Sequence, residues 1–457
     1  MSKVIELLIY HPFTPFAAIF AIACLFVIII VSIKDRCILP GLAFIFLFSM
    51  ALALETMNIE CRAIVYYIIV FLVVTVIVLN SYHQKFRPLL ELNPSHFFLL
   101  LWFLIMLIGI FLYNPAPREL VVKKIFYCIS FVFCPYYLGR SFSGDLKEKK
   151  IERIFYYIMI FMGVCSILLF LASVMAYQGE ERLGFDNDTS PTLAISKISA
   201  LTLLVFLFNA FFLKQKSFNI VISLIVVVLS LFTLLLTVSR GAVFSASVAF
   251  FIILFFFRQL TMKRFLFSAM TMIFVVGIAV VTLPDETKDS LNRRFDASDV
   301  TLEEYSNNRL YLYRIAFQMI YERPVLGFGP ASFSVFAPWG ASSDKAAKKF
   351  DANVSLYTPH NAFLEAFCEN GLLGLLCFLG VLFFSTLQLL NLRHSEHYSN
   401  RVKYMLACFF ITHLFLMQGV ANMTNLPLLW LMIGLLTQMN EPSIGFRRKR
   451  FRFPDQG

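Results

Sequence analysis

Charged residues are scarce in this sequence and make up only 15% of its 457 residues. A soluble domain carries about 25% charged residues, whereas 59% of this chain is hydrophobic. A soluble protein cannot bury so much apolar surface, which excludes a cytosolic enzyme and a disordered chain. The sequence also lacks Cys-x-x-Cys pairs and metal-ligand spacings. We therefore interpret its nine cysteines as small core residues.

Long apolar runs fill most of the chain instead. A helix needs about 20 apolar residues to cross the hydrocarbon core of a bilayer. Thirteen segments approach this length, or twelve if one early segment is re-entrant. We therefore predict an all-α polytopic membrane protein with 12–13 transmembrane helices. The segments are 13–33, 38–56, 63–80, 97–113, 124–139, 155–177, 192–213, 218–238, 241–257, 265–283, 371–391, 404–421 and 426–440.

The basic residues predict which side of the membrane each loop faces. The net charge of +11 would suggest nucleic acid in a soluble protein, but cytoplasmic loops of membrane proteins are rich in Lys and Arg. If the Arg-rich tail is cytoplasmic, the inside loops and the tail together hold 22 Lys and Arg, whereas the short outside loops and the N-terminus hold 7. This asymmetry supports the orientation, and no nucleic-acid partner is expected.

One loop is much longer than the others and is predicted on the outer face. Residues 284–370 carry 9 basic and 12 acidic residues and contain helical stretches. Long loops in compact proteins are usually functional. We therefore divide the chain into a membrane bundle (1–283), this loop (284–370), the C-terminal membrane helices (371–440) and a basic cytoplasmic tail (441–457).

Arg240 is an isolated cation between two apolar runs, where it is followed by Gly241. The turn is predicted to face outward, where the positive-inside rule disfavours arginine. One interpretation is an arginine that extends to lipid headgroups. The other is an anion-binding arginine at the outer boundary of the membrane, with Gly241 permitting close approach of a ligand.

A second candidate segment is a predicted helix that begins near Ser306 and ends before Pro324. Arg309 falls in its first turn, where a cation opposes the helix dipole, so a purely structural role is less natural there. Arg314 lies one turn further on and points away, which favours a solvated position. The helix is followed by a predicted turn over Gly327–Pro330.

The third candidate segment is Thr358-Pro359-His360-Asn361, which precedes a predicted helix. Thr358 suits the cap position and Pro359 the first helical position, so we expect His360 in the first turn. The N-terminus of such a helix would offer free N–H groups to phosphate oxygens. A lone histidine is nevertheless more often structural than catalytic, and we interpret the other six histidines as structural.

These segments follow one another in an order that resembles the O-antigen ligase and O-antigen polymerase superfamily of bacterial envelope glycosyltransferases. The pattern of His-Asn, nine residues and Gly-x-x-Gly is similar to the signature of that superfamily. An earlier outside loop also resembles its Arg-x-Gly stretch, although the Asn and Pro that follow are separated here. The matching residues are Arg182, Gly184, Asn187, Pro191, Arg240, Gly241, Asn308, Arg309, Pro324, Gly327, Gly329, Pro359, His360, Asn361, Gly371 and Gly374.

The resemblance implies an inner-membrane enzyme with a periplasmic active site. Its donor would be a glycan linked to undecaprenyl diphosphate. Its acceptor would be lipid A–core for a ligase, which is slightly preferred, or a second lipid-linked glycan for a polymerase. No metal and no cofactor are expected. His360 would be the general base, and Arg240 and Arg309 would stabilise the diphosphate. Further substrate-binding candidates are Arg182, Asn361, Arg314, Gly327 and Gly329.

A transporter or flippase is the alternative of another class. It would favour ionisable residues in the middle of membrane spans, and the sequence offers only Lys197 and His413. A membrane scaffold without activity would give no reason for Arg240, Arg309 and His360. The enzyme interpretation requires these three side chains to converge at the outer boundary of the membrane.

Overall fold

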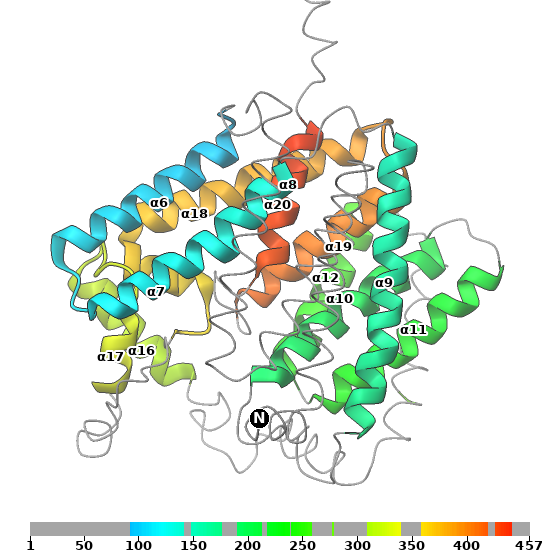
Figure 1. Cartoon of the computed structure of the whole chain (residues 1–457), viewed down its shortest axis with the longest axis horizontal. Helices are drawn as coiled ribbons and strands as arrows, with labels where there is room; N and C mark the ends of the chain where they lie inside the picture. Colours follow the sequence, from blue (N-terminus) through cyan, green and yellow to red (C-terminus); the bar gives the residue numbers. More distant parts are fainter. Residues whose placement is uncertain are drawn as a thin grey trace, which may run out of the picture.

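A computed structural model describes residues 92–140, 148–175, 190–212, 217–237, 239–257, 277, 309–339, 358–418 and 426–440. Within these ranges every regular element is helical (Figure 1). The predicted all-α class is therefore confirmed. The predicted spans 13–33, 38–56 and 63–80 lie outside the described residues, as does nearly all of 265–283.

The described helices follow the predicted apolar runs closely, because long runs of this kind satisfy every backbone group internally, as a membrane requires. A short π-helix, η1, joins α7 and α8 into one continuous helical segment. The helices are α6 (Pro94–Tyr113), α7 (Arg118–Cys128), η1 (Ile129–Phe133), α8 (Cys134–Arg140), α9 (Glu148–Met175), α10 (Ser190–Phe212), α11 (Ser217–Leu236), α12 (Arg240–Phe256), α16 (Arg309–Glu322), α17 (Phe333–Trp339), α18 (Ala362–His394), α19 (Asn400–Leu416) and α20 (Pro427–Asn440).

Four of the described segments are long and apolar enough to cross a membrane. They are Pro94–Leu112, Arg118–Arg140, Asn219–Leu236 and Ala362–His394. Shorter apolar helices occur within α9, α10, α12 and α20. The protein is therefore a polytopic membrane protein, and the total of 12–13 spans stays a prediction.

Close contacts between helices explain the positions of several glycines. α8 packs against α20 (Figure 1), and their backbones approach at Gly139 and Gly434. A Cβ atom on Gly139 would lie 2.2 Å from the carbonyl oxygen of Leu431, and one on Gly434 would lie 2.1 Å from that of Tyr136. Small residues let membrane helices approach in this way, since lipid provides no hydrophobic force between them.

α18 extends beyond its apolar run on the N-terminal side, as the predicted helix after Thr358 implied. It begins at Ala362, three residues later than predicted, and continues across a break at Gly371, whose φ is 66° and ψ −171°. α18 runs alongside α6 (Figure 1). The predicted boundary at residue 370 therefore falls inside one helix, and the first nine residues of α18 belong to the site described below.

α16 packs on the N-terminal part of α18. A small cluster of buried side chains joins the two helices and the turn that follows α16, and it includes Ile315, Met319, Phe328, Phe333 and Cys368. The described part of the long loop is thus a packed helical unit. This packing holds Arg309, at the start of α16, near the start of α18.

Candidate functional site

His360 lies immediately before α18, in a strained backbone conformation. Asn361 is the cap of this helix, because its Oδ1 accepts hydrogen bonds from the N–H groups of Phe363 (3.0 Å) and Leu364 (3.1 Å). The prediction that Thr358 caps the helix was wrong, since the asparagine side chain reaches both donors. His360 has a φ of 52°, which costs about 1–3 kcal/mol and is a common feature of functional sites.

The N–H groups of the first four residues of α18 are occupied. The Ala362 N–H donates to the carbonyl of Met417 (2.9 Å), and the Glu365 N–H donates to that of Asn361 (2.9 Å). Together with the two bonds to the Asn361 side chain, these account for the first four donors of the helix. These four N–H groups are therefore not free to bind phosphate, contrary to the expectation for this helix end.

Three helices meet beside His360. The carbonyl of Gln418, just beyond α19, accepts hydrogen bonds from the Asn361 side chain (3.3 Å) and from the Tyr313 hydroxyl of α16 (3.4 Å). Tyr313 follows Arg309 by four residues and so lies on the same face of α16. The end of α19 therefore links the helix that carries Arg309 to the segment that carries His360.

Two cations and one carboxylate act electrostatically on the half-buried imidazole of His360. Burial, Arg309 and Lys197 lower the pKa of His360 below its usual 6.5, and Glu365 opposes the shift. The imidazole is thus neutral at pH 7 and can accept a proton. The structure brings Arg309 and His360 together, and it adds Lys197 of α10, which is buried with 9% of its surface exposed.

The other three candidate arginines are described by the structure to different extents. Arg240 is the first residue of α12, and its side chain is not described. Arg182 lies outside the described residues. Arg314 is exposed on α16, as the sequence suggested. The functional roles of all three stay predictions.

The glycine turn after α16 packs against the break in α18. The N–H of Phe328 donates to the carbonyl of Cys368 (3.2 Å), and that of Gly329 donates to the carbonyl of Glu369 (2.7 Å). Gly327 and Gly329 have positive φ angles of 66° and 91°. A Cβ atom on Gly327 would lie 2.5 Å from the Glu369 carbonyl oxygen. These two glycines therefore let the turn pack closely against the start of α18. A direct contact between either glycine and a substrate stays a prediction.

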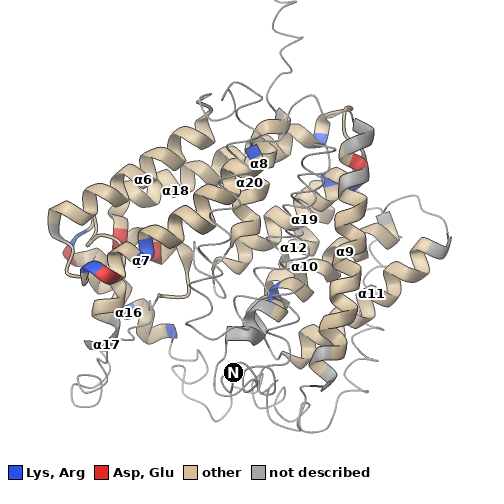
Figure 2. Ribbon diagram, viewed as in Figure 1, with Lys and Arg blue, Asp and Glu red and all other residues tan. Residues whose placement is uncertain are grey.

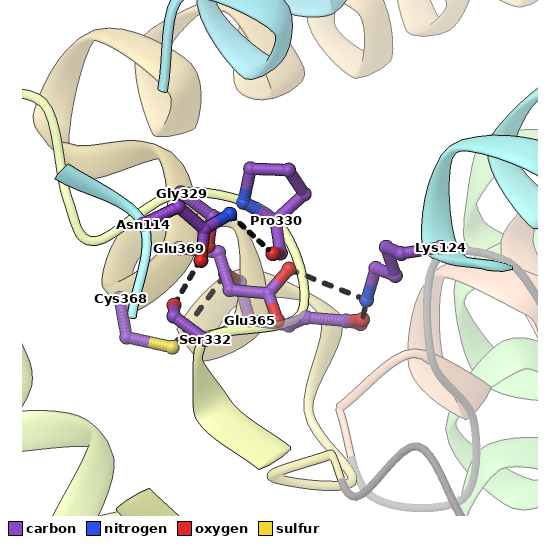
Figure 3. A network of polar contacts seen from close by, with 8 residues as sticks. All are labelled: Asn114, Lys124, Gly329, Pro330, Ser332, Glu365, Cys368 and Glu369. Carbon is purple, nitrogen blue, oxygen red and sulfur yellow. Dashed lines mark hydrogen bonds and ion pairs between the residues drawn. The ribbon is translucent and has the colours of Figure 1, made fainter. Parts of the chain in front are cut away.

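A buried ionic network lies on the adjacent turn of α18 and was missed by the sequence analysis (Figure 3). The ammonium group of Lys124 in α7 donates to Glu365 and lies 3.3 Å from an oxygen of Glu369. Lys124 is one of the 7 basic residues that the sequence analysis counted on the outer face. The sequence signal for this network was the spacing of Glu365 and Glu369, which lie four residues apart beside an apolar run and so share one face of a helix. Two carboxylates buried on such a face require a cation as partner.

Charged side chains gather at one end of the α6, α7 and α16 group, whereas most of the length of α6, α18 and α20 carries none (Figure 2). This distribution fits apolar spans that end at a polar boundary. The site around His360 lies at such a boundary, because α18 enters its long apolar stretch directly after it.

The fold defines a polytopic α-helical membrane protein with a cationic, histidine-containing site at the end of its helices. Residues 225–379 match a family described as O-antigen ligase, Wzy_C. The matched segment includes Arg240, α16, the glycine turn and His360. This match confirms the resemblance to the O-antigen ligase superfamily, and it supports an enzyme of the ligase or polymerase type.

A protein of Haemophilus influenzae is also similar to this chain. The two are 22% identical over 300 residues, which cover 58% of this chain and 73% of that protein. It is described only as an uncharacterized protein. The similarity therefore extends well beyond the segment matched by the family, but it adds no information on substrate.

Proposed function

We propose that this protein is a glycosyltransferase of the bacterial inner membrane that acts on its periplasmic face. It moves a glycan from undecaprenyl diphosphate to an acceptor hydroxyl, and as a ligase it uses lipid A–core as the acceptor. The observation that carries this proposal is that His360, in a left-handed backbone conformation before α18, and Arg309 of α16 belong to one packed unit, within the segment matched by the O-antigen ligase family.

The reaction needs a base and a stabilised leaving group. The acceptor oxygen forms a bond to the anomeric carbon of the donor glycan, and the bond from that carbon to the diphosphate oxygen breaks. His360 takes the proton of the acceptor hydroxyl, as a positioned histidine of this kind can. The diphosphate leaves with the electron pair, and the guanidinium groups of Arg309 and Arg240 stabilise its charge through paired hydrogen bonds.

Lys197 adds a further positive charge to the proposed site. It acts electrostatically on His360, although it lies outside the segment matched by the family. A polymerase of the same superfamily would use the same donor and base, with a second lipid-linked glycan as acceptor.

The envelope glycolipids of a deletion strain test this proposal. Loss of a ligase leaves bare lipid A–core and accumulates lipid-linked polymer, and the wild-type gene restores the normal profile whereas the His360→Ala variant does not. Core carrying a single repeat would instead identify a polymerase. An unchanged profile would contradict both forms of the proposal.

A further inference from the structure

One side of α18 is an exposed apolar stripe that runs along its membrane span. Its members recur every three or four residues, which places them on one side of the helix. Because α18 is long and apolar enough to cross a membrane, an exposed stripe of this kind faces lipid. The stripe consists of Leu372, Leu376, Leu379, Phe383, Leu387 and Leu390.

This lipid-facing stripe continues onto the segment that follows α16. The N–H of Leu372 donates to the carbonyl of Pro324 (2.7 Å), and that of Leu373 donates to the carbonyl of Val325 (3.3 Å). These bonds place Val325 and Leu326 beside Leu372 and Leu373, and all four side chains are exposed. The apolar surface of the membrane span therefore extends to the C-terminal end of α16.

The exposed side of α16 has an aromatic edge and a polar edge. Phe317 and Tyr321, which are 58% and 88% exposed, lie four residues apart and form the aromatic edge. Gln318 and Glu322 form the polar edge, where the Gln318 amide donates to the Glu322 carboxylate (3.3 Å). Phe317 and Glu322 point about 140° apart around a helix of 3.6 residues per turn. Helices that lie in a membrane–water interface are divided in this way.

We propose that α16 lies in the membrane–water interface, where its aromatic edge and the Val325–Leu326 segment bind the lipid leaflet on the side of the long loop. The occupant is lipid because this surface is continuous with the lipid-facing stripe of α18. Tyr321 suits this level, since its ring is apolar and its hydroxyl can reach water.

This lipid contact goes beyond the proposed function and does not depend on glycosyl transfer. α16 lies beside the N-terminal part of α18 (Figure 1), so a helix anchored there is held where the span begins. Because Arg309 is the first residue of α16, docking of this helix along the interface holds Arg309 at the level of the lipid headgroups.

Phe317→Cys and Glu322→Cys are a matched pair of variants that test this inference. Both positions are exposed on α16, so a water-soluble maleimide should reach both equally if no membrane covers the helix. The full-length protein is reconstituted with a single copy in each lipid nanodisc. Peptide mass spectrometry reads the reaction rate at the introduced cysteine and separates it from the native cysteines. Phe383→Cys, on the lipid-facing stripe, gives the rate of a lipid-covered position.

We expect Phe317→Cys to react at least about tenfold more slowly than Glu322→Cys, because the acyl region excludes a polar reagent and a thiol there stays protonated. Equal rates at these two positions in nanodiscs would overturn the proposal. If Phe317→Cys does not insert, Tyr321→Cys measures the same edge of α16 and should show the same protection.

The same pair in fragmented native membranes distinguishes lipid from a protein partner. Protection of Phe317→Cys in both native membranes and single-copy nanodiscs supports the lipid surface, because such a nanodisc holds no second protein. Protection in native membranes alone would overturn the proposal and assign the surface to a protein. These rates require no glycosyl transfer, so failure of the proposed function would leave this result unchanged.

Discussion

At the scale of single residues, the site depends on the charge state of His360. Its imidazole is half-buried, and two cations act on it against a single carboxylate. Each of these effects was invisible in the sequence, where His360 was one of seven histidines. Its left-handed backbone adds a second feature that a structural histidine does not need.

The rate of transfer should therefore depend on pH with a defined sign. Since the pKa of His360 lies below 6.5, the base is neutral at pH 7, and the rate should decline only as the pH falls through this lowered pKa, by about tenfold per pH unit below it. His360→Gln, which cannot take a proton at neutral pH, should lose about 10²–10⁴-fold in rate. Steady-state rates between pH 5 and 8 measure both effects. A fully active Gln variant with an unchanged profile would leave His360 as a positioning residue only.

Arg309 and Arg314 provide an internal comparison on one helix. Arg309→Lys keeps the charge but loses the planar group that holds two phosphate oxygens, so we expect at least a tenfold loss of kcat/KM, or about 1.5–3 kcal/mol for a charged hydrogen bond. The exposed Arg314→Lys should behave as wild type. Both variants are assayed for transfer after equal membrane insertion is confirmed. Normal activity of Arg309→Lys would argue against its contact with the diphosphate.

At the scale of elements, the break in α18 organises the site. Because Gly371 leaves the helical conformation, the N–H groups of Leu372 and Leu373 donate to the carbonyls of Pro324 (2.7 Å) and Val325 (3.3 Å) instead of continuing the helix. The carbonyls of Cys368 and Glu369 accept in return from the glycine turn. The turn and the helix break therefore complete each other's hydrogen bonding.

Gly371→Ala should destabilise the protein strongly. A Cβ atom there would lie 2.2 Å from the backbone oxygen of Val325, and φ is +66°, so strain and displacement together should cost more than about 2 kcal/mol. Gly163→Ala in α9 is the control, because its Cβ would meet side-chain atoms alone, the tip of the Phe206 ring at 3.1 Å and a methyl group of Val226 at 3.6 Å. Thermal unfolding in detergent should show a clear fall in Tm for the first variant and little change for the second. Equal midpoints would contradict a structural role for the break.

At the scale of the whole molecule, the orientation in the membrane decides which compartment supplies the substrates. The 22-to-7 distribution of basic residues predicts that the loop 284–370 lies outside the cytoplasm and that the Arg-rich tail lies inside. The structure adds that the start of α18 and α16 belong to one packed unit. The whole site must therefore lie on the same side of the membrane as this loop.

Reporter fusions test this orientation directly. A reporter that is active only in the periplasm should be active when fused near Asp344 and silent when fused after Arg452. The opposite pattern would place the site on the cytoplasmic face and would contradict a donor presented at the periplasmic leaflet. A cytoplasmic reporter at the same two positions gives the complementary control.

The sequence by itself determined the helical membrane class and the position of nearly every described span, since an apolar run of about 20 residues has one stable structure in lipid. It also singled out Arg309, His360 and the glycine turn. Only the tertiary structure decided that Asn361 and not Thr358 caps α18, because two donors and their neighbours must be placed in space to choose a cap. The pairing of Lys124 with Glu365 and Glu369 was likewise visible only in the tertiary structure. Lys124 and Glu365 are 241 residues apart, so their contact depends on which helices pack together, and local periodicity carries no information on that packing.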